Sequence, residues 1–202
     1  MRNVVFVTGG SGGIGSEICR EFALIGYPVA IGYNTNKSNA ECLADEICHA
    51  NGTAIPIKCD VGSGESIEKA IAIISSELGA VEILVNNAGI ANINLFTDLS
   101  NEDIYKIINV NLIGAMLCSK AVLPEMIKRK HGKIINITSV WGEVGASCEA
   151  AYSAAKSGVI GFTKALAKEV APSGINVNAV SAGIVNTPMN NCLSDDEIAQ
   201  II

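Results

Sequence analysis

The sequence predicts an α/β fold in which helices cover both faces of a doubly wound parallel sheet, giving three layers. Short apolar segments alternate along the chain with longer amphipathic ones. Each strand–helix–strand repeat needs a crossover connection, which makes the joined strands parallel. The first apolar segment runs directly into a glycine-rich turn, TGGSGGIG, that opens a helix. With 202 residues and no low-complexity linker, residues 1–202 are predicted to form a single domain.

The predicted strands are short and apolar, and Gly, Pro, Asn or Asp residues bound them. They cover residues 3–9, 28–33, 53–60, 81–89, 132–139 and 174–183. The segments between them show the longer, amphipathic pattern of helices. These predicted helices cover residues 13–25, 37–50, 64–78, 101–129 and 150–171. Pro172 and Gly174 end the last helix before the final strand begins.

Composition argues against several classes of function. The formal net charge of −6 leaves no basic surface for nucleic acid. No apolar run reaches the roughly 18 residues of a membrane span, and the N-terminal MRNVVFVTGG lacks the pattern of a cleavable signal. The seven cysteines include no C-x-x-C pair, and with two histidines they predict no metal site. Such scattered thiols are typical of reduced proteins, so we expect a cytoplasmic location.

The glycine-rich turn has the features of a phosphate-binding loop. Gly9, Gly13 and Gly15 follow a predicted strand that ends near Thr8, and they lead into a predicted helix. Glycines allow the backbone to approach a pyrophosphate, and the helix N-terminus offers unpaired N–H groups with a positive dipole. The turn therefore predicts a dinucleotide site, and the alternative is a flexible turn that binds nothing.

The end of the second predicted strand bears on which dinucleotide binds. An acidic residue there accepts the free ribose hydroxyls of NAD and repels the 2′-phosphate of NADP. This chain has Tyr33, Asn34, Thr35 and Asn36, followed by Lys37, and no carboxylate. We therefore predict NADP(H), with Asn34 and Lys37 near the phosphate, while NAD(H) remains an alternative. The alternative for Lys37 is a solvated side chain in the first turn of the next helix.

A tyrosine and a lysine lie four residues apart in the alanine-rich helix 150–171. Tyr152 and Lys156 share one face of that helix, so their side chains are within mutual reach. Tyrosine titrates at about pH 10 in water, and the adjacent ammonium is expected to lower its pKa. Ser139 ends a predicted strand, where open α/β sheets place their ligands. The three residues predict proton transfer to a carbonyl oxygen that receives hydride at carbon; the alternative is a surface Tyr–Lys pair.

Taken together, these motifs resemble the short-chain dehydrogenase/reductase family, nearest its 3-oxoacyl-[acyl-carrier-protein] reductase branch. The resemblance runs from Val4 to about Met189. Besides the glycine loop it rests on CDV at 59–61, NNAG at 86–89, NVNLIG at 109–114, ITS at 137–139, YSAAK at 152–156 and AGIVNT at 182–187. It implies a Rossmann fold and an NAD(P)-dependent oxidoreductase that acts on CH–OH or C=O groups.

The resemblance also implies roles for individual residues. Asn111, Ser139, Tyr152 and Lys156 would form a catalytic tetrad, in which Asn111 holds a water that links Lys156 to solvent. The residues expected at the cofactor, with Asn34 and Lys37 included, are Gly9, Ser11, Gly12, Gly13, Ile14, Gly15, Asn34, Lys37, Asp60, Val61, Asn87, Ala88, Gly89, Tyr152, Lys156, Gly183, Ile184, Val185 and Thr187. Of these motifs, NNAG is expected either to stabilise the central sheet or to line the cofactor channel. No metal ion is implied.

The sequence departs from the family pattern at three places. Ala182-Gly183 replaces the usual Pro-Gly and keeps the glycine. Gly12 stands where NADP-binding relatives often carry Arg or Lys, which weakens the case for NADP(H). The chain ends at Ile202, within SDDEIAQII, so the resemblance implies a C-terminally truncated domain without the family's last helix and strand.

The resulting hypothesis is an NADPH-dependent carbonyl reductase that transfers hydride to a 3-oxoacyl thioester and gives a 3-hydroxyacyl product. The substrate would be either a small molecule or a group linked to a carrier. Trp141, Glu143 and Glu149 open an alternative, because carboxylates near a pocket suit a cationic substrate. This stretch also resembles reductases of the 5-aminopentanone group on elongation factor P. The alternative is that both carboxylates point to water. An alternative of another class is a catalytically silent NAD(P)-binding regulatory protein.

The two longest predicted helices carry more apolar surface than one face of a sheet needs. Their sequences NLIGAMLCSKAVL and AAKSGVIGFTKALAKEV are rich in alanine and leucine. We therefore expect a homo-oligomer, a dimer or a homotetramer, that packs through helices 101–129 and 150–171.

Overall fold

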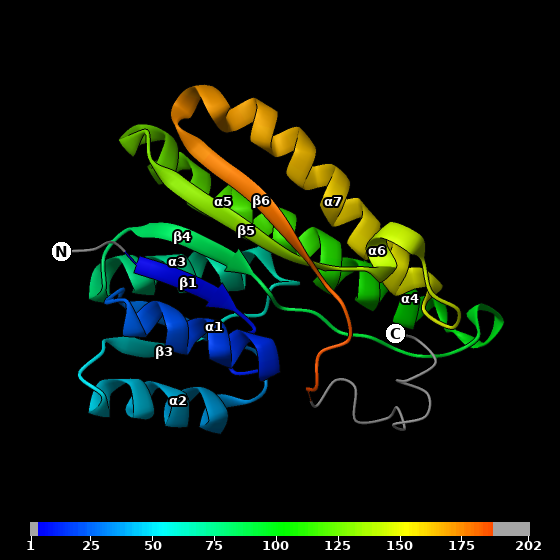
Figure 1. Cartoon of the computed structure of the whole chain (residues 1–202), viewed down its shortest axis with the longest axis horizontal. Coiled ribbons are helices and arrows are strands. Elements are labelled where there is room, and N and C mark those ends of the chain that lie inside the picture. The colour runs from blue at the N-terminus through cyan, green and yellow to red at the C-terminus, as the bar shows by residue number, and fades with distance from the viewer. Residues whose placement is uncertain (1–3, 188–202) are drawn as a thin grey trace.

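The structure is a computed structural model that describes residues 4–187. Six strands form one parallel sheet in the order β3-β2-β1-β4-β5-β6 (Figure 1). They are β1 (Val4–Thr8), β2 (Val29–Tyr33), β3 (Ala54–Lys58), β4 (Val81–Asn86), β5 (Gly132–Ser139) and β6 (Ile175–Ala182). The chain order reverses between β1 and β4, and such a reversal opens a crevice at the carboxyl ends of the strands. The predicted doubly wound parallel sheet is confirmed.

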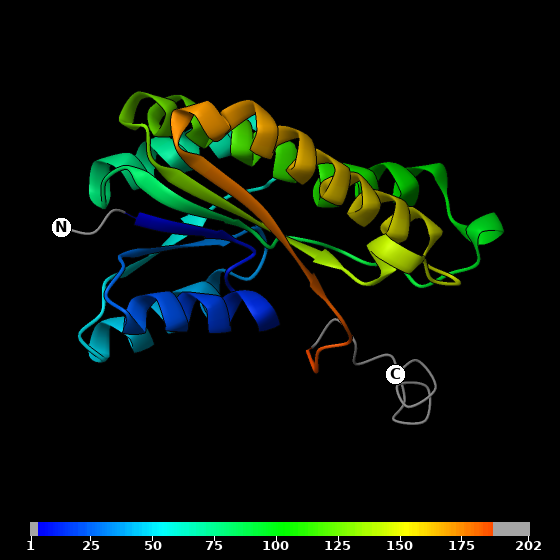
Figure 2. The same cartoon turned by 45° about the horizontal axis from the view of Figure 1, so that its top comes forward.

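Helices cover both faces of this sheet. They are α1 (Gly13–Leu24), α2 (Lys37–His49), α3 (Gly64–Glu77), α4 (Asn101–Ile108), α5 (Gly114–Arg129), α6 (Trp141–Val144) and α7 (Ala150–Val170), with the short turns η1 (Phe96–Asp98), η2 (Asn109–Ile113) and η3 (Ala171–Ser173). The helices α1 and α2 pack on one face, and α3, α5 and α7 pack on the other (Figure 2). This is the three-layer arrangement that the alternating pattern predicts.

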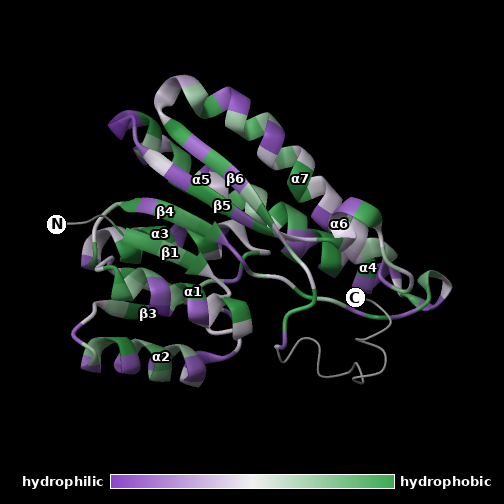
Figure 3. Cartoon of the chain, viewed as in Figure 1, coloured by the Kyte–Doolittle hydropathy of each residue, from purple (hydrophilic) through white to green (hydrophobic). Residues whose placement is uncertain are grey.

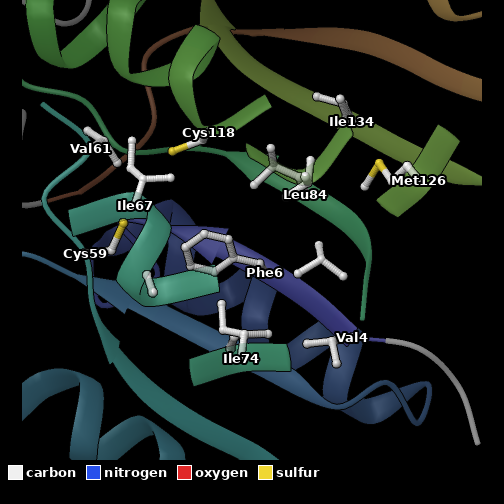
Figure 4. Close-up of a cluster of buried hydrophobic side chains, with 14 of the residues drawn as sticks. Val4, Phe6, Cys59, Val61, Ile67, Ile74, Leu84, Cys118, Met126 and Ile134 are labelled. Carbon is white, nitrogen blue, oxygen red and sulfur yellow. The ribbon is translucent and has the colours of Figure 1, made fainter. Parts of the chain in front are cut away.

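Strand β1 shows why the central strands are mainly apolar. All five of its residues are buried. Val5 and Val7 pack with α1 and α2, whereas Val4 and Phe6 belong to the cluster under α3 and α5 (Figure 4). Because successive side chains of a strand point to opposite faces, a strand covered on both sides needs an uninterrupted apolar run. Figure 3 shows these apolar strands next to helices that carry both polar and apolar residues.

The observed helices agree with the predicted ones to within one residue at each end, except in the segment 101–129. That segment is one helical run, but a π-helical turn, η2, interrupts it between α4 and α5. Turns of this kind are frequent at functional sites. The sequence pattern does not predict α6, because four residues are too few to show a helical period. The segment 188–202, which bears on the expected truncation, lies outside the described residues.

The helical run Asn101–Arg129 is long and apolar enough to cross a membrane, judged by length and composition alone. This is weak support for a membrane span, because the core helices of many proteins pass the same test. One face of α5 packs into the core through Cys118 and Met126. Elsewhere on the run Ile113 and Met116 are 40% and 42% exposed. The homo-oligomer expected through this run and α7 stays a prediction.

Gly15 in α1 is expected to tolerate no side chain. An ideal Cβ there would lie 2.3 Å from the backbone oxygen of Gly9 and 2.7 Å from Nδ2 of Asn87. The substitution Gly15→Ala must therefore push α1 away from the glycine loop, and we expect it to lower the free energy of unfolding by about 1–3 kcal/mol. Urea unfolding measures this loss.

Gly161→Ala in α7 is the matched control, because an ideal Cβ at Gly161 meets nothing within 4 Å. An alanine in a helix interior should raise the free energy of unfolding by about 0.5–1 kcal/mol. A Gly15→Ala protein as stable as the parent would contradict the close packing of α1 on the loop.

Candidate active site

A cleft of about 880 Å³ lies at the carboxyl ends of the strands. Nearly all residues predicted at the cofactor or substrate line it. These are Gly9, Ser11, Gly12, Gly13, Ile14, Asn34, Asp60, Val61, Asn87, Ala88, Gly89, Ser139, Tyr152, Lys156, Gly183, Ile184, Val185 and Thr187. The structure therefore brings together segments that are distant in the sequence. The predicted residues that do not line the cleft are Gly15, Lys37, Asn111 and Glu143.

The glycine loop between β1 and α1 is shaped to hold an anion. Gly9 has a φ angle of +62°, and an ideal Cβ on it would lie 2.9 Å from Cα of Ala88, so both backbone angle and space favour glycine. Within residues 4–187, no side chain caps the first turn of α1, which follows Gly12, and no acidic residue lies in that turn. Its N–H groups and the positive end of the helix dipole are thus available at the cleft. These residues fit the pyrophosphate of a dinucleotide.

The two asparagines of NNAG have different tasks. Asn86 is buried in the sheet, where its Nδ2 donates to Oδ1 of Asn136 at 2.8 Å and to Oγ of Ser119 at 3.0 Å. Asn87 lines the cleft, and its Nδ2 donates to the backbone oxygens of Thr8 and Gly9 at 3.1 and 3.0 Å. NNAG therefore stabilises the sheet, fastens the glycine loop and lines the cleft, while its contact with a cofactor stays a prediction.

Tyr152 and Lys156 face the cleft from α7, beside Ser139 at the end of β5. The Nζ of Lys156 lies 5.6 Å from the centroid of the Tyr152 ring and donates to the backbone oxygen of Ile137 at 2.8 Å. Tyr152 also shares a side-chain hydrogen bond with Ser139. The Oγ of Ser139 accepts a second hydrogen bond, from the backbone N–H of Trp141 at 3.2 Å. A phenol, a hydroxyl and an amine thus converge on one part of the cleft.

Close contacts with α6 and β5 fix the part of α7 that carries Lys156. An ideal Cβ on Gly142 would lie 2.8 Å from the backbone carbonyl carbon of Lys156, so α6 approaches as closely as glycine allows. The Oγ1 of Thr138 donates to the backbone oxygen of Lys156 at 3.1 Å. The Oγ of Ser157 donates to the backbone oxygen of Gly142. The backbone under Lys156 is therefore held from two sides, which sets the direction of its side chain.

Asn111 lies in the π-helical turn η2, behind the cleft. Its Nδ2 donates to the backbone oxygens of Ile90 and Ile107 at 2.8 and 2.9 Å, and its Oδ1 accepts from the N–H of Ile90 at 3.2 Å. Asn111 and Lys156 both line a separate cavity of about 10 Å³, which is close to the smallest volume that holds one water. The water implied between Asn111 and Lys156 stays a prediction. This cavity is of a size that suits it.

Known proteins match this chain over nearly all of its length. A family model described as short chain dehydrogenase matches residues 3–198. The chain belongs to the short-chain dehydrogenase family. It is 41% identical over 199 residues to the 3-oxoacyl-[acyl-carrier-protein] reductase of Synechocystis sp., which covers 98% of this chain and 81% of that protein. It is 43% identical over 199 residues to the 3-oxoacyl-[acyl-carrier-protein] reductase FabG of Escherichia coli (strain K12), covering 98% of this chain and 80% of that protein.

As a short-chain dehydrogenase, the protein is an NAD(P)-dependent oxidoreductase that acts on CH–OH or C=O groups. Burial raises the pKa of Tyr152, the carboxylate of Glu149 raises it further, and the hydrogen bond with Ser139 lowers it. Burial also lowers the pKa of Lys156 to about 8. The expectation that Lys156 brings the pKa of Tyr152 down is therefore wrong for this structure. At neutral pH the phenol is a proton donor.

At the end of the cleft near Asn34, the structure differs from the prediction for Lys37. The Lys37 side chain is exposed and forms an ion pair with Glu41 at 3.1 Å, as in the solvated alternative. The cation that reaches Asn34 is Lys58, whose Nζ donates to the backbone oxygen of Asn34 and to its Oδ1 at 2.8 Å. Lys58 ends β3 and pairs in register with Tyr33 at the end of β2. Pairing of neighbouring parallel strands was the signal that could have found it.

The two carboxylates near the substrate end have different environments. Glu143 is exposed, as the alternative of solvent-facing carboxylates requires. Glu149 is half-buried and lines the cleft near Tyr152 and Trp141, and burial raises its pKa. No hydrogen bond or ion pair of the Glu149 carboxylate occurs among the residues that the structure describes. Glu143 is therefore exposed as the solvent-facing alternative has it, whereas Glu149 faces the cleft, and its contact with a substrate stays a prediction.

Proposed function

We propose that this dehydrogenase is an NADPH-dependent reductase that converts a 3-oxoacyl thioester to the 3-hydroxyacyl product. The observation that carries the proposal is the convergence of Tyr152, Ser139 and Lys156 in one cleft with the glycine loop. The names of the two relatives support the substrate class, because both are reductases of 3-oxoacyl groups on acyl carrier protein. The cytoplasmic location is part of the same proposal.

The cofactor would lie along the cleft from the glycine loop to the residues after β6. The loop and the N-terminus of α1 would hold the pyrophosphate, and Asp60 and Val61 would contact the adenine. Lys156 would hydrogen-bond ribose hydroxyls, while Ile184 and Thr187 would meet the nicotinamide end. When bound, a reduced nicotinamide supplies the hydride.

The protein's own residues would handle the proton and the position of the carbonyl. The hydroxyl of Ser139 donates a hydrogen bond to the substrate oxygen and holds it beside Tyr152. Tyr152 donates its phenolic proton to that oxygen as the carbonyl carbon becomes tetrahedral. Lys156 would then pass a proton back to the phenolate that results. The water expected at Asn111 would return a proton to Lys156.

Tyr152→Phe is expected to remove the proton donor and keep the cleft. Turnover of a 3-oxoacyl thioester with NADPH should fall by about 10²–10⁴-fold, the usual contribution of a general acid. The affinity for NADPH should stay within a few-fold, since the ring remains. Loss of nicotinamide absorbance measures the turnover, and fluorescence titration measures the affinity for NADPH.

Tyr105→Phe is the matched control, because the Tyr105 side chain on α4 is 71% exposed and lies outside the cleft lining. Activity that survives in Tyr152→Phe would contradict the proposed proton donor. Tight NADPH binding by the parent protein, with no turnover of any 3-oxoacyl thioester, would instead favour the silent regulatory alternative.

The preference for NADPH would rest on Asn34 and Lys58. No carboxylate occurs in the segment Tyr33–Lys37 that follows β2, so a 2′-phosphate meets no repulsion there. The ammonium of Lys58 supplies a positive charge at the same place, beside the Asn34 side chain.

Lys58→Met is expected to weaken NADPH binding roughly tenfold through loss of one charge-assisted contact. Binding of NADH should change less than twofold, because NADH lacks the 2′-phosphate. Lys37→Met is the control, since Lys37 pairs with Glu41 instead. Measured Kd values for both nucleotides decide the matter, and an equal loss for NADPH and NADH would contradict the role of Lys58.

A second candidate substrate is a ketone that carries an ammonium group, as in the 5-aminopentanone group on elongation factor P. The observation that favours it is the half-buried Glu149 carboxylate, which lines the cleft without an internal partner among the described residues. A desolvated carboxylate gains more from a cation than an exposed one does. An acyl thioester offers no such cation.

The second candidate predicts a charge preference that depends on Glu149. Two ketones of equal length are compared, one with a terminal ammonium and one with that amine acetylated. In Glu149→Gln, kcat/KM for the ammonium ketone should fall roughly tenfold, while that for the acetylated ketone should hold. Glu143→Gln is the exposed control. A parent enzyme that prefers the acetylated ketone would rule this candidate out.

A further inference from the structure

The segment that follows β3 runs antiparallel to η2 and the first half of α5. At one end, Nδ2 of Asn109 donates to the backbone oxygen of Gly62 at 3.2 Å. Further along, an ideal Cβ on Gly114 would lie 2.9 Å from Cγ2 of Val61 and 3.1 Å from its backbone oxygen. Glycine at this position is what lets the helix approach the segment so closely.

This packing places Cys118 opposite Cys59. Cys118 follows Gly114 by one helical turn on the same face, a rise of about 6 Å. Cys59 precedes Val61 by two residues, which span about 7 Å at most. The distance from Gly114 to Cys118 along the helix is thus close to the distance from Val61 back to Cys59 along the segment. Because of this match, the contact of Gly114 with Val61 is followed by a contact of Cys118 with Cys59. Figure 4 shows both cysteines in one cluster, with their sulfur atoms turned toward one another.

The two thiols are buried and interact. Cys59 is 4% exposed and Cys118 is 0% exposed. The hydrogen bond between them lowers the pKa of Cys59, whereas that bond and burial raise the pKa of Cys118 well above its ordinary value. The lowered pKa of Cys59 favours its thiolate, the form that reacts with a peroxide. Cys59 also lines the large cleft, so a small reagent in the cleft reaches it first.

We propose that Cys59 and Cys118 form a redox-active dithiol site, which a peroxide converts to an intramolecular disulfide that weakens nucleotide binding in the cleft. The effect on nucleotide rests on the proposed function, because it takes Asp60 and Val61 to contact the adenine. The site itself rests on the packing of α5 against the segment after β3.

The oxidation balances with hydrogen peroxide as the named oxidant. The Cys59 thiolate attacks one peroxide oxygen, the O–O bond breaks, and a sulfenic acid and hydroxide form. The sulfur of Cys118 then attacks the Cys59 sulfur and forms the S–S bond. The sulfenic oxygen leaves as water with the proton of Cys118. The two sulfurs together lose two electrons, and the peroxide becomes two waters once hydroxide takes up the proton first lost by Cys59.

The disulfide would reshape the adenine end of the cleft. A covalent bond holds two sulfurs closer than hydrogen-bonded thiols, so it draws Cys59 toward α5. Asp60 and Val61 follow directly and line the same part of the cleft. Conversely, a nucleotide bound there covers the approach to Cys59 and should slow the oxidation. A thiol reductant reverses the change by exchange.

The test treats the reduced 202-residue chain with hydrogen peroxide and follows intact mass and peptide maps. We expect the mass to fall by that of two hydrogen atoms and a crosslinked peptide to join Cys59 to Cys118. The oxidised protein should bind NADPH about tenfold more weakly, the equivalent of roughly one hydrogen bond, and dithiothreitol should restore the affinity. Saturating NADPH should slow the crosslinking several-fold.

Cys118→Ala should lose the mass change, whereas Cys42→Ser, which alters an exposed cysteine, should keep it. The NADPH protection, measured on the parent chain, tests the proposal even where Cys118→Ala fails to fold. Oxidation of exposed cysteines without the Cys59–Cys118 crosslink overturns the site. A crosslink that leaves NADPH affinity unchanged overturns its control of binding. A chain that forms the crosslink and then binds NADPH more weakly, but whose reduced form reduces no carbonyl, supports the dithiol site and contradicts the proposed reductase instead.

Discussion

Buried amide hydrogen bonds at the centre of the sheet set the positions on which the site depends. Asn86 of β4 donates to Asn136 of β5, and Asn136 donates to Oγ1 of Thr163 in α7 at 2.8 Å. Asn86 also donates to Ser119 in α5. A buried amide left unpaired costs more than a bond gains, so these four elements cannot slide past one another independently. Lys156 lies two turns before Thr163, and Asn111 lies about two turns before Ser119, so one network positions both.

The same burial that positions the lysine also changes its chemistry. Removal from water destabilises the ammonium of Lys156 and the phenolate of Tyr152 alike, because each is the charged form of its group. The pKa of the amine therefore falls and that of the phenol rises. A proton consequently resides on Tyr152 at neutral pH, which suits donation to a carbonyl oxygen during reduction.

Glycines at close approaches decide how near the layers of the site come to one another. Gly15 brings α1 onto the loop, Gly142 brings α6 onto α7, and Gly114 brings α5 onto the segment after β3. Each of these contacts places a functional group next to a distant part of the chain. The third contact sets the thiols of Cys59 and Cys118 together at the edge of the cleft, where the proposed chemistry at sulfur and the proposed binding of nucleotide would share the same few residues.

The sequence by itself determined the sheet, the helices on both faces and most of the cleft lining, because strand, helix and glycine-turn patterns are local and repeat along the chain. It also placed Tyr152 and Lys156 correctly, since residues four apart on a helix share a face. Only the tertiary structure decided the surroundings of Lys58, Glu149 and the Cys59–Cys118 pair, which depend on neighbours brought in from other elements. The direction of the Tyr152 pKa shift was also decided only by the tertiary structure. Local spacing reveals a nearby charge, but it does not reveal how far the phenol is desolvated.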